Sequence, residues 1–459
     1  MRIPGAAVLL AAILATPAAA QISDNKIKIA VLDDFSGQYC NGNCMGPVTA
    51  SRIAAEEFGN KIAGAPIEII WGDHQNKPDA AAALVSKWFD VEQVDAIADI
   101  TNSSVGLAAN RIARDRGKAV LMSSTGSPDF TGKECAPYTT QWTFDTYQFG
   151  KSIAEAVPQL GKTWFIVTPD YLFGKTLEAN VRKFVTAAGG KIVGSVVHPF
   201  GTNDMSSFML QAQSSGAQVI ALANAGGDLT NAIKTAKEFG LVDAGIKIVP
   251  LSLDLPFIDG IGGLNVAQGM MMTLPWYPGL KPEAMEFAVK FKKVQGVMPG
   301  YLMAGLYSVV HNYLLAIKAT GTDNPKAVFA KMRETPVNDA FATGGKLRPD
   351  GRMVHDVYLV QVKKPSESKG PDDLVKLIAT IPGDKAFRPM SEGGCPFVTT
   401  KVAAAEPPAP AAHPDKLTPA KPEVAPSAPA SEDHTTLIIV VIVVVIVVGG
   451  GIYFWRRKS

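Results

Sequence analysis

The sequence predicts an α/β protein made of two doubly wound, Rossmann-like lobes joined by a hinge with several crossovers, followed by a C-terminal transmembrane helix. Short β-branched runs alternate with amphipathic helical stretches in two successive series, which predicts the two lobes. A long uncharged run near the C-terminus predicts the transmembrane helix. The net charge of +2 gives no electrostatic reason to expect nucleic acid as a partner.

The first series of strands and helices lies in the N-terminal third of the chain. An amphipathic helical stretch follows each of its first three strands, and a crossover of that length joins parallel neighbours. These units therefore predict a parallel sheet covered by helices. Its strands are expected to begin at Ile27, Ile67, Asp95 and Lys118.

A second series of similar length follows, again with a helix after each strand. Two series of this size favour two separate lobes over one very wide sheet. The strands of the second series are expected to begin at Trp164, Lys191, Gln218 and Ile246.

Three more helices and two more strands complete the predicted body. We expect them to return to the lobes already formed, so that the chain crosses between lobes near residues 142–147, 270–275 and 343–355. The helices are expected at residues 282–294, 301–319 and 325–333, and the strands from Asp356 and Leu374. The predicted division is lobe 1 at residues 21–145 and 274–350, and lobe 2 at residues 146–273 and 351–400.

The N-terminus has the features of a secretory signal peptide over residues 1–20. Arg2 supplies a positive start, residues 8–14 form a short apolar run, and three alanines at residues 18–20 suit a signal peptidase. The exported chain is therefore expected to begin at Gln21.

The C-terminal segment has the features of a membrane anchor. Residues 437–455 carry no charge, are rich in Val and Ile, and are long enough to cross a bilayer as a helix. Three basic residues follow in the short tail 456–459, which places that tail in the cytoplasm. Residues 401–434 are rich in Pro and Ala and are expected to be an extended tether. We therefore expect the protein on the periplasmic side of the inner membrane, anchored by one C-terminal helix.

Four cysteines in an exported chain indicate two disulfides, for which three pairings are possible. We expect Cys40 to pair with Cys44, and Cys135 to pair with Cys395. A zinc site is the alternative, but one CxxxC motif without a second pair or a nearby histidine lacks the four ligands that zinc needs. No metal site is expected.

Six motifs occur along the body in a fixed order. In this order they resemble the type I periplasmic solute-binding proteins of the branched-chain amino acid ABC transporter family, over residues 27–397. The resemblance implies two lobes that close on a small molecule and deliver it to an ABC permease in the inner membrane. The motifs are IKIAVLDDFSGQY, DHQNKPDAAAA, NSS, SSTGSPDFTG, DYLFG and LANAGGD.

The first lobe is expected to hold the carboxylate of the ligand. Ligands of open α/β sheets bind beyond the carboxyl ends of the strands, where helix N-termini present N–H groups. Helix capping is the alternative role for these polar side chains. The resemblance implies carboxylate contacts at Asn102, Ser124 and Gly126. The candidate residues of lobe 1 are Asn102, Ser103, Ser104, Ser124, Thr125 and Gly126.

The second lobe is expected to contribute Tyr171, Phe173, Asn224, Ser252 and Asp254. The resemblance implies an aromatic ligand contact at Phe173, although this ring could instead staple the start of its helix. Relatives that bind amino acids pair the ammonium with an acidic residue, and Ser252 stands at that position. Either Asp254 replaces it after a shift of the loop, or the ligand has no ammonium, because an unpaired buried ammonium is costly.

These features predict the solute-binding component of an ABC importer for a small carboxylate-bearing solute. The solute would be a branched-chain or other amino acid, or an aromatic or aliphatic organic acid. The alternative is a membrane-anchored ligand-sensing ectodomain that acts through a partner protein. We expect no enzyme activity and no cofactor, because the sequence has no HExxH, GxSxG or Walker motif, and His74 is expected in a solvated loop.

Overall fold

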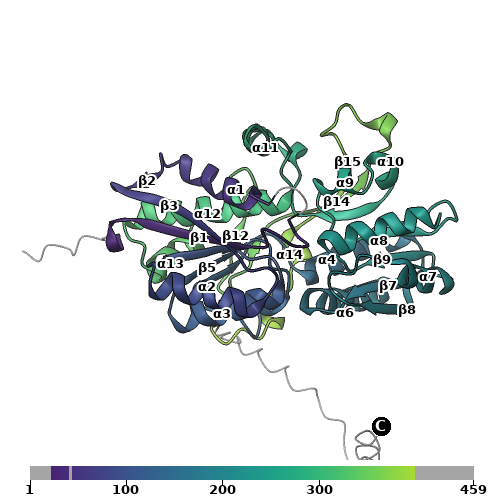
Figure 1. Cartoon of the computed structure of the whole chain (residues 1–459), viewed down its shortest axis with the longest axis horizontal. Coiled ribbons are helices and arrows are strands. Elements are labelled where there is room, and N and C mark those ends of the chain that lie inside the picture. Colours follow the sequence, from purple (N-terminus) through teal and green to yellow (C-terminus); the bar gives the residue numbers. More distant parts are fainter. Residues whose placement is uncertain (1–21, 41–43, 399–459) are drawn as a thin grey trace, which may run out of the picture. The chain divides into compact units, whose positions relative to one another are not determined.

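The computed structural model describes residues 22–40 and 44–398, which form two helix-covered sheets (Figure 1). The first sheet, the base of lobe 1, has the order β2-β3-β1-β4-β5-β6, in which only β2 and β3 pair antiparallel. Its strands are β1 (Ile27–Asp33), β2 (Lys61–Ile62), β3 (Ala65–Asp73), β4 (Ala96–Asp99), β5 (Ala119–Met122) and β6 (Thr139–Gln141).

Helices cover both faces of this sheet. The helices α2 (Pro78–Asp90) and α3 (Ser103–Asp115) pack on one face, where Val85 and Val105 join the same apolar cluster as Leu32. On the other face, α1 (Gly46–Glu56) packs against α12 (Tyr301–Thr320). Late helices therefore return to lobe 1, as the sequence predicted. The neighbours of α12 in the chain are α11 (Pro282–Gln295) and α13 (Pro325–Glu334).

The second sheet, the base of lobe 2, is parallel throughout and has the order β10-β9-β7-β8. These strands confirm the second predicted series. Its strands are β7 (Thr163–Pro169), β8 (Lys191–His198), β9 (Val219–Leu222) and β10 (Lys247–Pro250). Its longer helices are α4 (Thr146–Ile153), α6 (Leu172–Ala187), α7 (Ser206–Ser214) and α8 (Gly226–Glu238).

The late strands pair with one another, which the sequence did not predict. β11 (Met271–Leu274) pairs antiparallel with β14 (Val357–Val362), and β14 pairs antiparallel with β15 (Val375–Ile381). The sequence predicted that the late strands return to the lobes but did not predict this third sheet, in which they pair with each other. The remaining short elements are α5 (Val157–Leu160), α9 (Phe257–Gly260), α10 (Leu264–Ala267), α14 (Gly383–Ala386), β12 (Lys346–Leu347) and β13 (Met353–Val354).

The predicted membrane anchor requires a correction. Within residues 22–40 and 44–398, no helix has the length and apolar character needed to cross a bilayer. The expected helix at residues 437–455 lies outside this part of the chain, as do the leader, the tether and the short tail. We therefore correct the fold class, for the described residues, to a two-lobed α/β fold in which no helix is long and apolar enough to cross a membrane. The expected location, anchored by a C-terminal helix, is not supported by the described residues.

Both predicted disulfides are confirmed. Cys40 pairs with Cys44, and Cys135 pairs with Cys395, which are 260 residues apart in the sequence. The longer-range bond ties the end of the described chain to the loop before β6 of lobe 1. The domain boundaries within the body stay a prediction.

Candidate ligand-binding site

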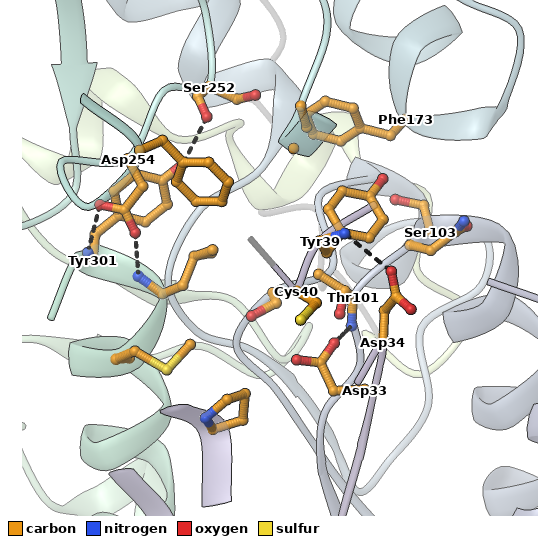
Figure 2. Close-up of a pocket in the computed structure, with 18 of the residues that line it drawn as sticks. Asp33, Asp34, Tyr39, Cys40, Thr101, Ser103, Phe173, Ser252, Asp254 and Tyr301 are labelled. Carbon is orange, nitrogen blue, oxygen red and sulfur yellow. Dashed lines mark hydrogen bonds between the residues drawn. The ribbon is translucent and has the colours of Figure 1, made fainter. Parts of the chain in front are cut away.

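A cleft lies between the lobes at the carboxyl ends of the strands (Figure 2). Its unoccupied volume is about 750 Å³, part of which is open to solvent. Loops after β1, β4 and β5 line it from lobe 1, and loops after β7 and β10 line it from lobe 2. This is the position at which open α/β sheets bind ligands.

The structure brings together seven of the predicted ligand-binding residues in the lining of this cleft. They are Asn102, Ser103, Ser124, Tyr171, Phe173, Ser252 and Asp254. Four others lie beside the lining: Ser104, Thr125, Gly126 and Asn224.

Three of these four residues make a hydrogen bond within their own lobe, and Gly126 contacts a ring of the other lobe. The N–H of Ser104 donates to the side chain of Asn102 at 2.9 Å, and the Thr125 hydroxyl donates to a backbone carbonyl at 2.5 Å. The Asn224 amide donates to the buried His198 ring at 2.6 Å. Gly126 lies against an aromatic ring, since a Cβ there would be 2.7 Å from Phe173. These residues shape the loops that carry the lining.

The turn between β4 and α3 has a strained backbone. Asp99, Ile100 and Asn102 have φ angles of 74°, 68° and 72°. Such left-handed angles are unfavourable for a β-branched residue such as isoleucine, and residues of this kind concentrate at functional sites. This turn leads into α3, whose N-cap is Asn102, and residues 101–103 line the cleft.

Hydroxyl groups on this wall have different hydrogen-bonding roles. The buried Thr101 hydroxyl has no hydrogen-bond partner within the described chain, and the Ser103 hydroxyl accepts the N–H of Ser127 at 3.0 Å. Both therefore keep a proton that they could donate to a ligand. The Ser124 hydroxyl instead donates to Asp99, so it presents lone pairs to the cleft.

A buried acid pair lies beneath the lobe 1 wall. Burial raises the pKa of Asp33 well above its usual value, and the nearby Asp99 raises it further. Burial also raises the pKa of Asp99. His74 is fully buried rather than solvated as expected, with its Nε2 atom 4.0 Å from Asp33, and burial lowers its pKa to about 4. The sequence signal for this cluster was the Asp-Asp pair that follows the first strand.

The lobe 2 wall is aromatic. Tyr171 and Phe173 stand at the start of α6, with their ring centroids 5.9 Å apart, and Phe257 follows β10. Sequence reasoning missed Phe257, and on the opposite side it missed Tyr39 and the rings of Phe144 and Tyr301. Their position directly after expected strands or at expected helix starts was the only available signal.

The residues expected to meet a ligand ammonium are already engaged. The Asp254 carboxylate accepts the N–H groups of Tyr301 at 3.0 Å and of Leu302 at 3.3 Å (Figure 2). Burial raises the pKa of this carboxyl to about 6. The Ser252 hydroxyl donates to the carbonyl of Asn224 at 2.7 Å. Neither side chain is therefore a free partner for an ammonium.

No lysine or arginine occurs among the described residues of the lining, and these residues contain no cluster suited to a metal ion. The charged residues that line the cleft are Asp33, Asp34 and Asp254. A bound anion would therefore depend on hydroxyl and N–H donors, which the lobe 1 wall supplies.

Two contacts cross the cleft beside the aromatic wall. The hydroxyls of Tyr39 in lobe 1 and Tyr171 in lobe 2 are 2.6 Å apart. The N–H of Gly227, in the first turn of α8, donates to the carbonyl of Gln38 at 3.0 Å. These contacts join the loop after β1 to lobe 2.

Comparison with known proteins agrees with this geometry. The sequence model of the family described as periplasmic binding protein matches residues 26–371. The chain belongs to this family. Like the branched-chain amino acid transporter proteins that it resembles, it is a periplasmic solute-binding protein of the ABC transporter type. A periplasmic location fits the family.

Three relatives illustrate the similarity. A periplasmic binding protein from Burkholderia mallei is 40% identical, with a TM-score of 0.78 over 81% of this chain and 99% of that chain. A branched-chain amino acid ABC transporter ligand-binding protein from Burkholderia xenovorans is 36% identical, with a TM-score of 0.73 over 81% and 100%. The Leu/Ile/Val-binding protein homolog 6 of Brucella melitensis is 27% identical over 74% of this chain and 88% of its own length.

Proposed function

We propose that this periplasmic binding protein captures a small carboxylate-bearing solute in the cleft and presents it to an ABC permease in the inner membrane. The observation that carries the proposal is the pairing of unlike walls. Hydroxyl donors at the start of α3 lie across the cleft from aromatic rings of lobe 2. A hydrogen bond between the two lobes closes the cleft beside these rings.

The lobe 1 wall suits a carboxylate. The first turn of a helix leaves N–H groups without helical partners and carries a partial positive charge, and α3 is long enough, at 13 residues, for both effects. The Thr101 and Ser103 hydroxyls add two donors beside that turn. In a cleft without a lysine or arginine in its described lining, these donors are the groups that would hold the anion.

The remainder of the cleft suits an apolar body without an ammonium. Aromatic side chains line it, and they favour a flat or branched apolar group. Because Asp254 is engaged with backbone N–H groups, an organic acid, and an aromatic acid in particular, is favoured over an amino acid. The aromatic lining consists of Tyr39, Phe144, Tyr171, Phe173, Phe257 and Tyr301.

An amino acid is the second candidate. The relative from Burkholderia xenovorans, which is 36% identical, is described as a branched-chain amino acid ABC transporter protein. The two candidates differ in one group, the ammonium, so ligands matched in every other respect separate them.

A thermal-shift screen tests the proposal. The panel pairs each amino acid with its deaminated acid, for example phenylalanine with 3-phenylpropanoate and leucine with 4-methylpentanoate. We expect at least one acid to raise the melting temperature by several degrees, because a ligand that binds only the folded state stabilises it. If no amino acid and no organic acid of the panel raised the melting temperature, the proposed function would be contradicted.

A further inference from the structure

Helix α12 has no N-terminal cap of its own. The first N–H groups of a helix have no acceptor within it, and the N-cap residue here, Gly300, has no side chain to supply one. The acceptor comes from a distant residue. Asp254 accepts the N–H groups of Tyr301 and Leu302, the first two residues of the helix (Figure 2).

Asp254 and α12 belong to different lobes. Asp254 follows β10, the edge strand of the lobe 2 sheet, whereas α12 packs against α1 on the lobe 1 sheet. Within lobe 1, the Tyr307 hydroxyl of α12 donates to the carboxylate of Glu57, directly after α1, at 3.0 Å. The bonds from α12 to Asp254 therefore cross the cleft. A carboxylate at this end of a 20-residue helix also interacts favourably with its dipole.

The contact requires glycine at position 300. A Cβ there would lie 2.0 Å from the Asp254 carboxylate. The φ angle of Gly300 is −101°, which any residue adopts, so the backbone itself does not need a glycine. The missing side chain at residue 300 makes room for the side chain of residue 254.

We propose that Asp254 is a positioning residue that holds the two lobes together across the cleft by capping α12, and that it does not pair with a charged group of the ligand. Asp254 is 3% exposed, and its carboxylate also accepts the N–H of Leu255 at 2.8 Å. It has no ion pair within the described chain, so backbone N–H groups are its main partners. This role goes beyond the proposed function, because it concerns closure and not the identity of the solute.

A second contact across the cleft reports independently on closure. The N–H of Gly227 donates to the carbonyl of Gln38, and it contacts neither Asp254 nor α12. If Asp254 holds the lobes together, its loss must expose the Gly227 amide. If Asp254 only caps the helix, the Gly227 amide keeps its protection.

Hydrogen exchange of the full chain without added solute separates these cases. We expect Asp254→Asn and Gly300→Ala each to speed exchange by about tenfold, both in the first turn of α12 and at Gly227. The matched control is Asn324→Ala, which removes the N-cap of α13, where Asn324 accepts the N–H of Lys326 at 3.0 Å inside lobe 1. That variant should speed exchange at the start of α13 alone.

Faster exchange confined to α12 in both cleft variants would show that Asp254 caps the helix without holding the lobes, and would overturn the proposal. The readout uses no ligand, so a failed solute screen leaves this result unaffected, and a failed exchange experiment leaves the solute-binding function standing.

Discussion

The two walls of the cleft are built from different kinds of groups. On lobe 1, strand ends and the first turn of α3 present hydroxyl and N–H donors, two of which keep a proton for a ligand. On lobe 2, polar side chains are engaged within the protein, and the rings of Tyr171, Phe173 and Phe257 line the cleft. Lobe 1 adds the rings of Tyr39, Phe144 and Tyr301 beside its hydroxyl donors. We propose from this difference that lobe 1 recognises the charged end of the solute, and that lobe 2 covers its apolar body when the lobes close.

Removal of the lobe 1 donors should have the largest effect. The combined change Thr101→Val and Ser103→Ala removes both free hydroxyls, and hydrogen bonds to a charged group contribute about 1.5–3 kcal/mol each. We expect the Kd for an acid to rise by roughly a hundredfold or more in isothermal titration calorimetry. Ser104→Ala, one residue further along α3 and outside the lining, should leave it unchanged. Equal losses in the two variants would contradict the assignment.

Removal of a ring from the lobe 2 wall should weaken ligand binding without changing the preference for a charged acid over its uncharged amide. Phe257→Ala removes apolar contact area worth about 2 kcal/mol, so the Kd should rise by roughly thirtyfold. The factor should be the same for an acid and for its uncharged amide. A change in the ratio of acid to amide affinity would show that lobe 2 also reads the charge.

The buried histidine behind the lobe 1 wall predicts a pH dependence of stability. Burial lowers the folded-state pKa of His74 to about 4 from its ordinary value of 6.5. Between pH 4 and pH 6.5 the ring is therefore protonated in the unfolded chain but neutral in the folded protein. Acidification through that window should therefore destabilise the protein. The stability difference between the unaltered protein and His74→Gln, measured by urea unfolding, should fall by about 2 kcal/mol from pH 6.5 to pH 4.5. A constant difference would contradict a neutral buried ring.

The hydroxyl pair between the walls should have the smallest effect. Tyr39→Phe or Tyr171→Phe removes one hydrogen bond across the cleft, which contributes about 1 kcal/mol. Ligand dissociation in stopped-flow measurements should become about fivefold faster. The double variant should add little to either single change, because both remove the same bond. Additive effects would mean that the two hydroxyls act separately.

The sequence predicted the features that follow from local pattern. Asn102 and Phe173 line the cleft as expected, because strand ends and helix starts are visible in hydrophobic periodicity and parallel strands bring those ends to one edge. The family resemblance singled out these two residues within their loops, and their contact with a ligand stays a prediction. The disulfide from Cys135 to Cys395 was also predicted. The predicted transmembrane helix, in contrast, has no counterpart among the described residues.

Long-range packing decided what the sequence could not show. Asp254 was expected to face a ligand, but its partners at Tyr301 and Leu302 lie almost fifty residues further along the chain. The direction of the Ser124 hydroxyl depends on Asp99, a residue of another strand. Such contacts depend on how the helices and strands pack against one another, so hydrophobic periodicity in the sequence does not predict them.

Calorimetric titration of the unaltered protein with three matched ligands shows which groups of a solute the cleft recognises. An acid identified in the screen is compared with its uncharged amide and with the corresponding amino acid, for example 3-phenylpropanoate, 3-phenylpropanamide and phenylalanine. We predict that the acid binds most tightly, because we propose that the lobe 1 wall holds a carboxylate and because Asp254 is already engaged with backbone N–H groups. Tighter binding of the amide or of the amino acid would contradict it.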